Sequence, residues 1–324
     1  MADGKWIPDL APATPLADAA RHVLTIRLDV VRHFLPLALH HADEDLEHVH
    51  QLRVGTRRAG AALRIFSLCL PAKLFDTSNK LLRRLRRAAG AARDWDVFLE
   101  MLAQWEQKQT PRHRSGLDLL IGYATAQREL AQSQLCGAAA DHPFAFDRAI
   151  AETLAAIRRP PSGRPRRLID LARPMLAELL AELDEAAARD LTDYGNLHQV
   201  RIAGKRLRYA MEVFADCFEE QFRAQTYPAI EDMQEILGRA NDSHVAGHRL
   251  RALRERLQHS QPDAWKRCGP GVESLIKHHR DQLPRERKRF LEWWRHWRHV
   301  GLEATLTEQL NNRTDMNFDR IIAH

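Results

Sequence analysis

Two stretches of the chain carry histidine and arginine at the same spacing. The first reads VHQLRVGTRRAGAALRIF over residues 49–66, and the second reads LHQVRIAGKRLRYAMEVF over residues 197–214. An offset of 148 residues places His50 on His198, Gln51 on Gln199, Arg53 on Arg201, Arg58 on Arg206 and Phe66 on Phe214. Guanidinium groups recognise phosphate and carboxylate oxygens. Each stretch is therefore either part of an anion-binding site or simply a solvated basic surface.

The spacing predicts that both stretches are amphipathic helices. At about 100° per residue, the cations of the first copy fall within about 60° of one another, and in both copies the apolar residues lie opposite the cations. The basic stripe of the first copy consists of His50, Arg53, Arg57 and Arg64. The basic stripe of the second copy consists of His198, Arg201, Lys205 and Arg208, with Tyr209 beside them.

The duplication favours the anion-binding interpretation. Residues 81–97 match residues 229–245 at the same offset, which indicates that a whole helical block is repeated. Two such blocks packed with pseudo-twofold symmetry would bring the stripes to face each other across a cleft. Because like charges around one volume repel unless an anion neutralises them, the repeat predicts a receptor for a ligand with several phosphates.

His50 and His198 each open a basic stripe. Neighbouring cations lower the pKa of a histidine, so both imidazoles are expected to be neutral without ligand and to protonate more readily once phosphate is bound. A purely structural role, hydrogen bonding between helices, explains either residue equally well.

Composition and patterning predict an all-α fold. Of the 324 residues, 44% are apolar, which is enough for a sizeable core, and the formal net charge is +6. Apolar residues recur at helical spacing, and no segment alternates as a strand does. The sequence contains neither a membrane-spanning run nor a secretory signal, so the expected location is the cytoplasm, without integral membrane contact.

Proline and glycine mark the expected boundaries. Residues 158–167, RRPPSGRPRR, separate two helical blocks. Gly90 indicates a break or a tight packing point, followed by a further helix with Asp94 as its N-cap. The predicted parts are an N-terminal arm (1–13), one domain (14–300) made of repeat 1 (14–158), a linker (159–165) and repeat 2 (166–300), and a C-terminal tail (301–324). The repeat 2 helices are expected near residues 166–189, 194–216, 220–238, 242–259 and 264–281.

An aromatic face follows these helices. Phe290, Trp293, Trp294 and Trp297 lie at helical spacing and are flanked by arginines. We expect this helix to pack on the second repeat. The alternatives are contact with a membrane surface, with a granule surface or with a second copy in a dimer.

Catalytic motifs receive little support. The chain has no P-loop, GxSxG or GxGxxG motif, and no HExxH. A metal site could be assembled from Asp94, Asp96, Asp242, His244 and His248. Capping and helix packing explain Asp94 and Asp242 without a metal, however, and we expect neither a metal nor a cofactor.

The paired segments HQLRVGTRR with GAARDWDVFLEML, and HQVRIAGKRLRYAMEVF with MQEILGRANDSHVAGHRL, resemble the CHAD family, the conserved histidine α-helical domain. The resemblance covers residues 14 to 300. It implies two pseudo-symmetric four-helix-type bundles around a central basic groove or pore, and binding of inorganic polyphosphate, often on polyphosphate granules. Many members carry a catalytic CYTH domain, and this chain is similar to the stand-alone type.

The resemblance also implies which residues bind. The motif residues carried over, together with Arg83 and Arg87 of the neighbouring helix, are His50, Arg53, Arg57, Arg58, Arg83, Arg87, Arg93, His198, Arg201, Lys205, Arg206, Arg208 and Tyr209. Residues 81–97 hold five arginines, whereas Glu231 and Glu235 stand opposite Arg83 and Arg87 in the second copy. We therefore expect the first half to contribute more of the phosphate affinity.

The resulting expectation is a non-catalytic cytoplasmic protein that binds polyphosphate and associates with polyphosphate granules and their proteins. Two alternatives remain open. A basic groove attracts any phosphate chain, so nucleic acid is one, although Tyr209 is the one stacking aromatic among the stripe residues. The other, weaker alternative is a metal-dependent hydrolase of phosphate polymers.

Overall fold

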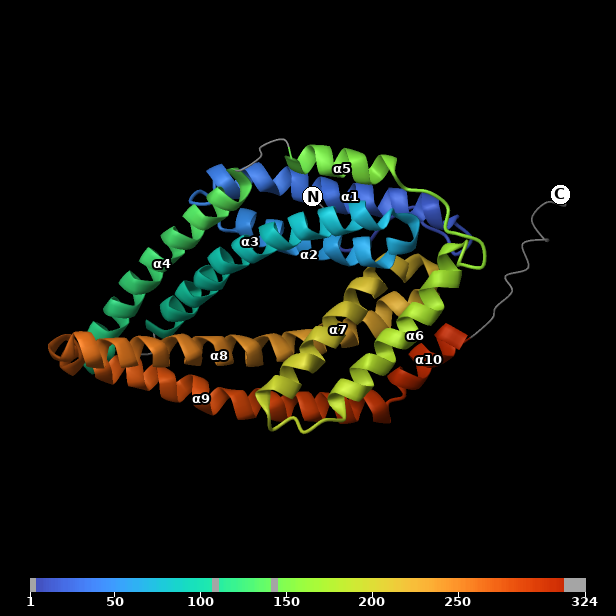
Figure 1. The fold of residues 1–324 in the computed structure, drawn as a ribbon. Coiled ribbons are helices and arrows are strands. Elements are labelled where there is room, and N and C mark those ends of the chain that lie inside the picture. The colour runs from blue at the N-terminus through green and yellow to red at the C-terminus, as the bar shows by residue number, and fades with distance from the viewer. Residues whose placement is uncertain (1–3, 107–110, 141–144, 312–324) are drawn as a thin grey trace.

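The computed structural model describes residues 4–106, 111–140 and 145–311 (Figure 1). As predicted, the fold is all-α, and within the described residues the sole β-type pairing is an isolated bridge between Pro15 and Arg167. The α-helices are α1 (Leu16–His40), α2 (Glu47–Ile65), α3 (Ala72–Glu106), α4 (Arg114–Ala140), α5 (Ala145–Ala155), α6 (Leu168–Ala187), α7 (Tyr194–Phe214), α8 (Tyr227–Ser260), α9 (Pro262–His299) and α10 (Leu302–Asn311). Short helical turns are η1 (Ser67–Cys69), η2 (Pro111–His113), η3 (Ala215–Cys217) and η4 (Phe222–Thr226).

The helices follow the same order of packing in both halves. In the first half α2 packs against α1 and α3, and α3 packs against α4; in the second, α7 packs against α6 and α8, and α8 packs against α9. The two repeated stretches, residues 49–66 and 197–214, thus lie on the corresponding helices α2 and α7. The pseudo-twofold axis and the boundaries of the repeats stay predictions.

The apolar core runs across the two halves. Its larger cluster joins Leu24 of α1 and Phe66 to Leu176 of α6 and Phe214 of α7. The smaller cluster lies where the far ends of α3 and α4 meet α8 and α9, and it joins Phe98, Leu120, Leu250 and Leu275. Since both clusters draw on both halves, neither predicted repeat has a separate apolar core among the described residues.

Three helices are longer than the sequence pattern predicts. The break at Gly90 is wrong, because α3 continues through it, and α8 spans the predicted gap near residue 240. α9 also runs from the predicted 264–281 helix into the aromatic segment, although Pro270 and Pro284 lie inside it. A glycine in a helix costs about 1 kcal/mol, which burial on both sides of Gly90 outweighs. Packing along the whole of α9 likewise holds its prolines in the helix.

Both ends of the described chain pack on the helices. Ile7 is buried, and the Arg27 guanidinium donates hydrogen bonds to the carbonyl oxygens of Gly4 and Lys5. At the other end the predicted tail includes α10, which packs on α6 and α9 through buried Leu306. The rest of the tail, residues 312–324, lies outside the described residues.

The aromatic face belongs to the core. Phe290 and Trp297 are almost fully buried, and Trp294 is 9% exposed. All three join the larger apolar cluster, while Trp293 is partly buried against it. This confirms packing within the fold as the role of the face.

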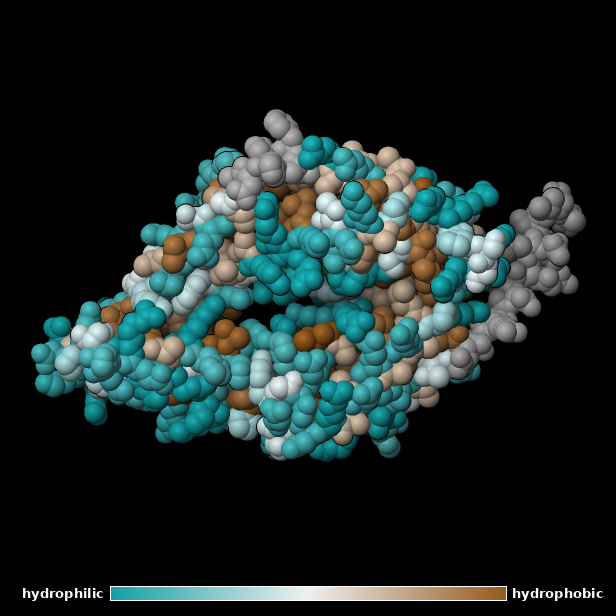
Figure 2. Space-filling view, viewed as in Figure 1, coloured by the Kyte–Doolittle hydropathy of each residue, from teal (hydrophilic) through white to brown (hydrophobic). Residues whose placement is uncertain are grey.

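The helices enclose a central space. Figure 1 shows α3 and α4 diverging from α1 and α2 toward the end where they meet α8 and α9. Figure 2 shows the surface hollowed between α1 and α2 at the top of the view and α8 and α9 at the bottom. Hydrophilic residues lie along much of the margin of this hollow. Among the described residues, no helix is long and apolar enough to cross a membrane.

Candidate functional site

The packing of α2 on α7 brings the two basic stripes around the same space. The helices are in contact. Burial, followed by the positive charge of Arg57 on α2, lowers the pKa of Arg201 and of Lys205 on α7. Because a charge shifts a pKa at short range, these three side chains lie close together.

A cavity of about 600 Å³ lies between α2, α3 and α7, and we call it the central cavity. Ala91, Gly90 and Tyr209 form part of its wall. The charged residues that line it are Arg53, Arg57, Arg64, Arg86, Arg87, Arg201, Lys205, Arg206 and Asp94. Eight basic side chains thus face one volume together with a single carboxylate.

Most of these basic side chains lack an anionic partner among the described residues. Arg53 pairs with Asp94 at 3.0 Å, and Arg206 pairs with Glu182 at 2.6 Å. The remaining six form no ion pair with the residues that the structure describes: Arg57, Arg64, Arg86, Arg87, Arg201 and Lys205. This concentration of uncompensated charge is unfavourable, and it would be relieved by an anion carrying several negative charges.

Burial and neighbouring positive charges lower the pKa values of Arg53 and Lys205 in the central cavity. Burial, and then Arg57, lower the pKa of Arg53 to about 10, so its guanidinium remains charged at neutral pH. Burial lowers the pKa of Lys205 to about 5, with Arg57 and Arg201 adding to the shift. The Lys205 amine is therefore neutral at pH 7 without a ligand, and a bound anion would favour its protonation.

Gly90 allows α2 and α3 to share this cavity. A Cβ atom built on Gly90 would lie 3.4 Å from Nε of Arg53. The absence of a side chain leaves space for the Arg53 guanidinium to lie against α3 and reach Asp94. Gly90 is thus the tight packing point that the sequence offered as an alternative to a break, and Asp94 lies inside α3 rather than at an N-cap.

A second cavity, of about 670 Å³, continues from the first between α2, α3, α8 and α9; we call it the mixed cavity. Arg53, Arg57 and Arg201 line both cavities. Four carboxylates line the mixed cavity: Asp94, Glu100, Asp242 and Glu286. Because several of its cations are paired, for example Arg239 with Glu286 at 3.1 Å, this cavity is much less positive than the central one.

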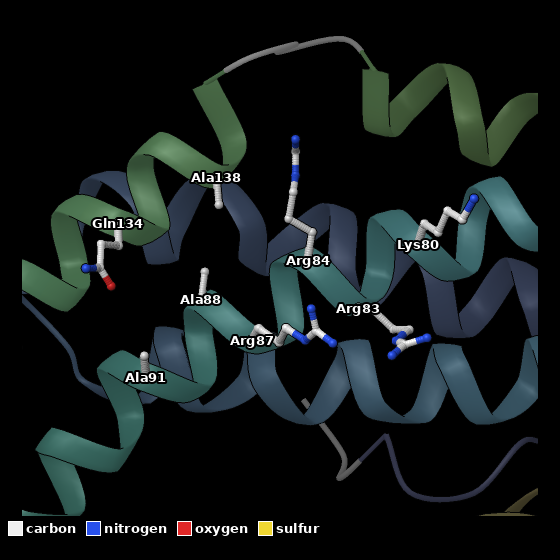
Figure 3. Close-up of a pocket in the computed structure, with 8 residues that line it drawn as sticks. All are labelled: Lys80, Arg83, Arg84, Arg87, Ala88, Ala91, Gln134 and Ala138. Carbon is white, nitrogen blue, oxygen red and sulfur yellow. The ribbon is translucent and has the colours of Figure 1, made fainter.

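A third cavity, of about 640 Å³, lies on the outer side of α3 beside α4; we call it the outer cavity (Figure 3). Its lining consists of Lys80, Arg83, Arg84, Arg87, Ala88, Ala91, Gln134 and Ala138. No carboxylate belongs to this lining. The four basic side chains all come from α3.

The two predicted histidines occupy different surroundings. His50 lines the mixed cavity, and burial, together with Arg93, Arg53 and Arg57, lowers its pKa against the opposing effect of Glu47. His198 lines none of the three cavities. Its ring lies 5.8 Å from that of Tyr194, and burial and then Arg201 and Lys205 lower its pKa. In both residues Nδ1 is buried without a hydrogen-bond partner among the described residues.

The structure divides the predicted binding residues. Seven of them line the central cavity: Arg53, Arg57, Arg87, Arg201, Lys205, Arg206 and Tyr209. The mixed cavity adds His50 and Arg93, and the outer cavity adds Arg83. Arg58, His198 and Arg208 line none of the three.

Arg58 and Arg208 have carboxylate partners instead. Arg58 donates to Glu212 at 2.8 Å, and Arg208 donates to Glu231 at 3.2 Å. Glu212 is 1% exposed and also lies 3.6 Å from the buried guanidinium of Arg27. These arginines are thus part of an ion-pair network beside the cavity.

Arg64 and Arg86 were missing from the predicted site. Arg64 lies on the first basic stripe, two turns after Arg57, so its position was available from spacing. Arg86 is on α3, outside the two basic stripes. Their contribution depends on how α3 packs against α2, which helical periodicity does not specify.

The described residues offer no group of three or more His, Cys, Asp or Glu side chains arranged to hold a metal ion. His244 stacks on Tyr194 with ring centroids 3.5 Å apart, and His248 lies 4.7 Å from His244. The i, i+4 histidine pair therefore belongs to an aromatic cluster between α7 and α8.

Comparison with known proteins places these features in a family. The model of the CHAD domain matches residues 22–251. The crystal structure of the CHAD domain from the plant Ricinus communis is similar, with a TM-score of 0.71 and 24% identity over 89% of this chain and 94% of the other. PptA from Streptomyces chartreusis is also similar, with a TM-score of 0.67 and 19% identity over 87% of this chain and 100% of the other. No curated protein sequence matches the chain.

Proposed function

The chain belongs to the CHAD domain family, and from this premise we propose that it binds inorganic polyphosphate through the central cavity, which forms a basic groove. The observation that carries the proposal is the set of six basic side chains, five of them charged arginines, that line about 600 Å³ and form no ion pair with the described residues. Arginine binds phosphate oxygens through paired N–H groups, and these charge-assisted bonds are stronger than neutral ones. A chain of linked phosphates supplies many such acceptors at once.

A polymer fits this site better than a single phosphate. Cations come to the cavity from three helices, with Arg57 on α2, Arg86 on α3 and Arg201 on α7. One phosphate dianion compensates two of these charges and leaves the others repelling one another. A linear polyanion neutralises them together and releases its counterions, which adds a favourable term that weakens with salt.

Nucleic acid is the competing phosphate chain. Tyr209 is the one aromatic side chain that lines the central cavity, and it is 7% exposed. Base stacking contributes about 1–3 kcal/mol per base in proteins that bind single strands, and one buried ring offers little of this. We therefore expect long-chain polyphosphate to displace single-stranded RNA of similar length.

The proposal is for binding without cleavage. Asp94, the carboxylate that lines the central cavity, is engaged by Arg53 at 3.0 Å. The assay is release of inorganic phosphate from long-chain polyphosphate in the presence of magnesium, manganese or zinc. We expect no release above background, and phosphate release that disappears in the R57A/R201A variant would identify a hydrolase.

Titration with polyphosphate at increasing salt tests the binding site. In R57A/R201A the slope of log affinity against log salt is expected to fall by about 1.5, because each lost phosphate contact removes about 0.7–0.9. The control, R285A/R295A, removes two positive charges from exposed positions of α9 that line none of the three cavities. Equal effects in both variants, or wild-type binding that is insensitive to salt, would contradict the proposal.

Association with polyphosphate granules follows from such binding. A fluorescent fusion of the wild-type chain is expected to gather on granules in cells that store polyphosphate. The R57A/R201A fusion is expected to disperse, while the R285A/R295A fusion stays on the granules. Persistence of R57A/R201A on the granules would point to recruitment by another granule protein.

A further inference from the structure

The outer cavity presents a second group of cations on the surface of α3. Figure 3 shows Lys80, Arg83, Arg84 and Arg87 along successive turns of this helix, with Ala88, Ala91 and Ala138 forming the small side chains between α3 and α4. All four cations are exposed. Lys80, Arg83 and Arg87 form no ion pair with the described residues, so negative charge around them is low.

The outer and central cavities adjoin. Arg87 and Ala91 line both. Arg83 also lies near the cations of the central cavity, because it contributes to the lowered pKa of Arg64 and of Arg86, in both cases after burial and other arginines. A phosphate chain leaving the central cavity past Arg87 therefore meets further cations immediately.

The opposite direction is less favourable for a polyanion. The mixed cavity holds four carboxylates, and Asp242 and Glu100 line the part beyond the shared arginines. Like charges disfavour a phosphate chain there. Charge alone thus distinguishes the two ways out of the central cavity.

The positions of the second half that correspond to the arginines of the outer cavity are acidic. At the 148-residue offset, Arg83, Arg84 and Arg87 correspond to Glu231, Asp232 and Glu235. Glu235 pairs with Arg239, and Glu231 pairs with Lys5 and Arg208. This group of cations therefore has no counterpart at the matching positions of the second half.

We propose that a long polyphosphate chain leaves the central cavity over the outer face of α3, across Arg87, Arg83, Arg84 and Lys80, rather than through the mixed cavity. This inference rests on the proposed function. The path from Ala91 to Lys80 adds about 16 Å along the helix, at about 1.5 Å per residue. Long chains therefore make contacts that a short oligophosphate held in the central cavity does not reach.

The test compares tripolyphosphate with long-chain polyphosphate on the variant K80A/R84A. Both residues line the outer cavity and neither lines the central one, so tripolyphosphate affinity is expected to stay within about twofold of wild type. Long-chain affinity at low salt is expected to fall about tenfold, and its salt slope by about 1.5, as for two lost phosphate contacts. K80E/R84E, which introduces acidic residues into the outer cavity, is expected to weaken long-chain binding further.

R285A/R295A again serves as the control for net charge. If it weakens long-chain binding as much as K80A/R84A does, the effect is non-local and the proposed path is overturned. Long-chain binding that is unchanged in K80A/R84A also overturns it. Neither result affects the proposed function, which fails instead if the wild-type chain binds neither tripolyphosphate nor long-chain polyphosphate.

Discussion

Whether an arginine beside the central cavity is available to a ligand depends on the carboxylates within its reach. Arg57 has none among the described residues, whereas Arg58, the next residue, is held by buried Glu212 at 2.8 Å. Arg206, the counterpart of Arg58, pairs with Glu182 at the cavity margin, where both side chains are more exposed. Neighbouring cations of one motif therefore divide into a ligand-binding group and a structural group.

Glu212 is expected to be important for stability. The change Glu212→Gln removes the anion that compensates Arg27 and Arg58, of which Arg27 is 2% exposed. Loss of one partner from a buried ion pair costs about 3–5 kcal/mol, because the remaining charge is left uncompensated. Urea unfolding followed by circular dichroism measures this loss.

Glu182→Gln is the matched control. Its partner Arg206 is about half-exposed, and such surface pairs contribute about 0–1 kcal/mol. A similar loss of stability in both variants would show that the Glu212 network has no special role.

Lys205 is expected to link polyphosphate binding to proton uptake. Its pKa of about 5 leaves the amine neutral at pH 7, and a bound polyanion raises that pKa. Affinity should therefore increase as pH falls from the pKa of the complex toward about 5, and level off below it. Calorimetry at pH 7 in buffers of different ionisation enthalpy measures the protons taken up.

The control for Lys205 is Lys205→Arg, which places a permanently charged group at the same position. His50 and His198 also have lowered pKa values and contribute to proton uptake in both proteins. The wild type is expected to take up about one proton more than the variant, if binding fully protonates the amine. Equal uptake would mean that Lys205 keeps its protonation state on binding.

At the scale of the helices, close backbone contacts fix how α4 crosses α9. A Cβ atom built on Gly116 of α4 would lie 2.8 Å from Cα of Gly271 on α9 and would also meet the carbonyl oxygen of Cys268. These are backbone atoms, so a side chain at Gly116 forces the helices apart. The far end of the central space depends on this crossing.

Gly116→Ala is therefore expected to lower the free energy of unfolding by about 1–3 kcal/mol, as overpacking does in well-packed interiors. Gly122, on the same helix, has nothing within 4 Å of its Cβ position. Gly122→Ala should stabilise the chain by about 0.5–1 kcal/mol through helix propensity. Thermal unfolding measures both effects. An equal loss of stability in the two variants would contradict the close approach of α4 to α9.

Helical periodicity predicts which face of a helix is buried more reliably than it predicts where the helix ends. It placed Arg53 and Arg57 on one stripe and the apolar residues opposite, and of these Leu52 and Leu63 are fully buried. It left a break or a tight packing point open at Gly90, because glycine is unfavourable in an isolated helix. The helix continues since tertiary packing on both sides offsets that local cost, and the sequence pattern contains no measure of such packing.

At the scale of the whole molecule, the central cavity exists because the halves are packed as one unit. The apolar clusters join α1 and α2 to α6 and α7, and the ends of α3 and α4 to α8 and α9. The repeat predicted that two basic stripes would come together, but not which helix would form the third wall. Arg86 lines the central cavity because it lies on this third helix, α3. Arg208 does not line it and pairs instead with Glu231 on α8.

The most direct measurement of the central claim is a crystal structure of the chain with tripolyphosphate. We expect phosphate oxygens within hydrogen-bonding distance of Arg57, Arg201 and Lys205, inside the cavity between α2, α3 and α7. Phosphates bound solely on the outer helices, or held by a metal ion against the carboxylates of the mixed cavity, would contradict it.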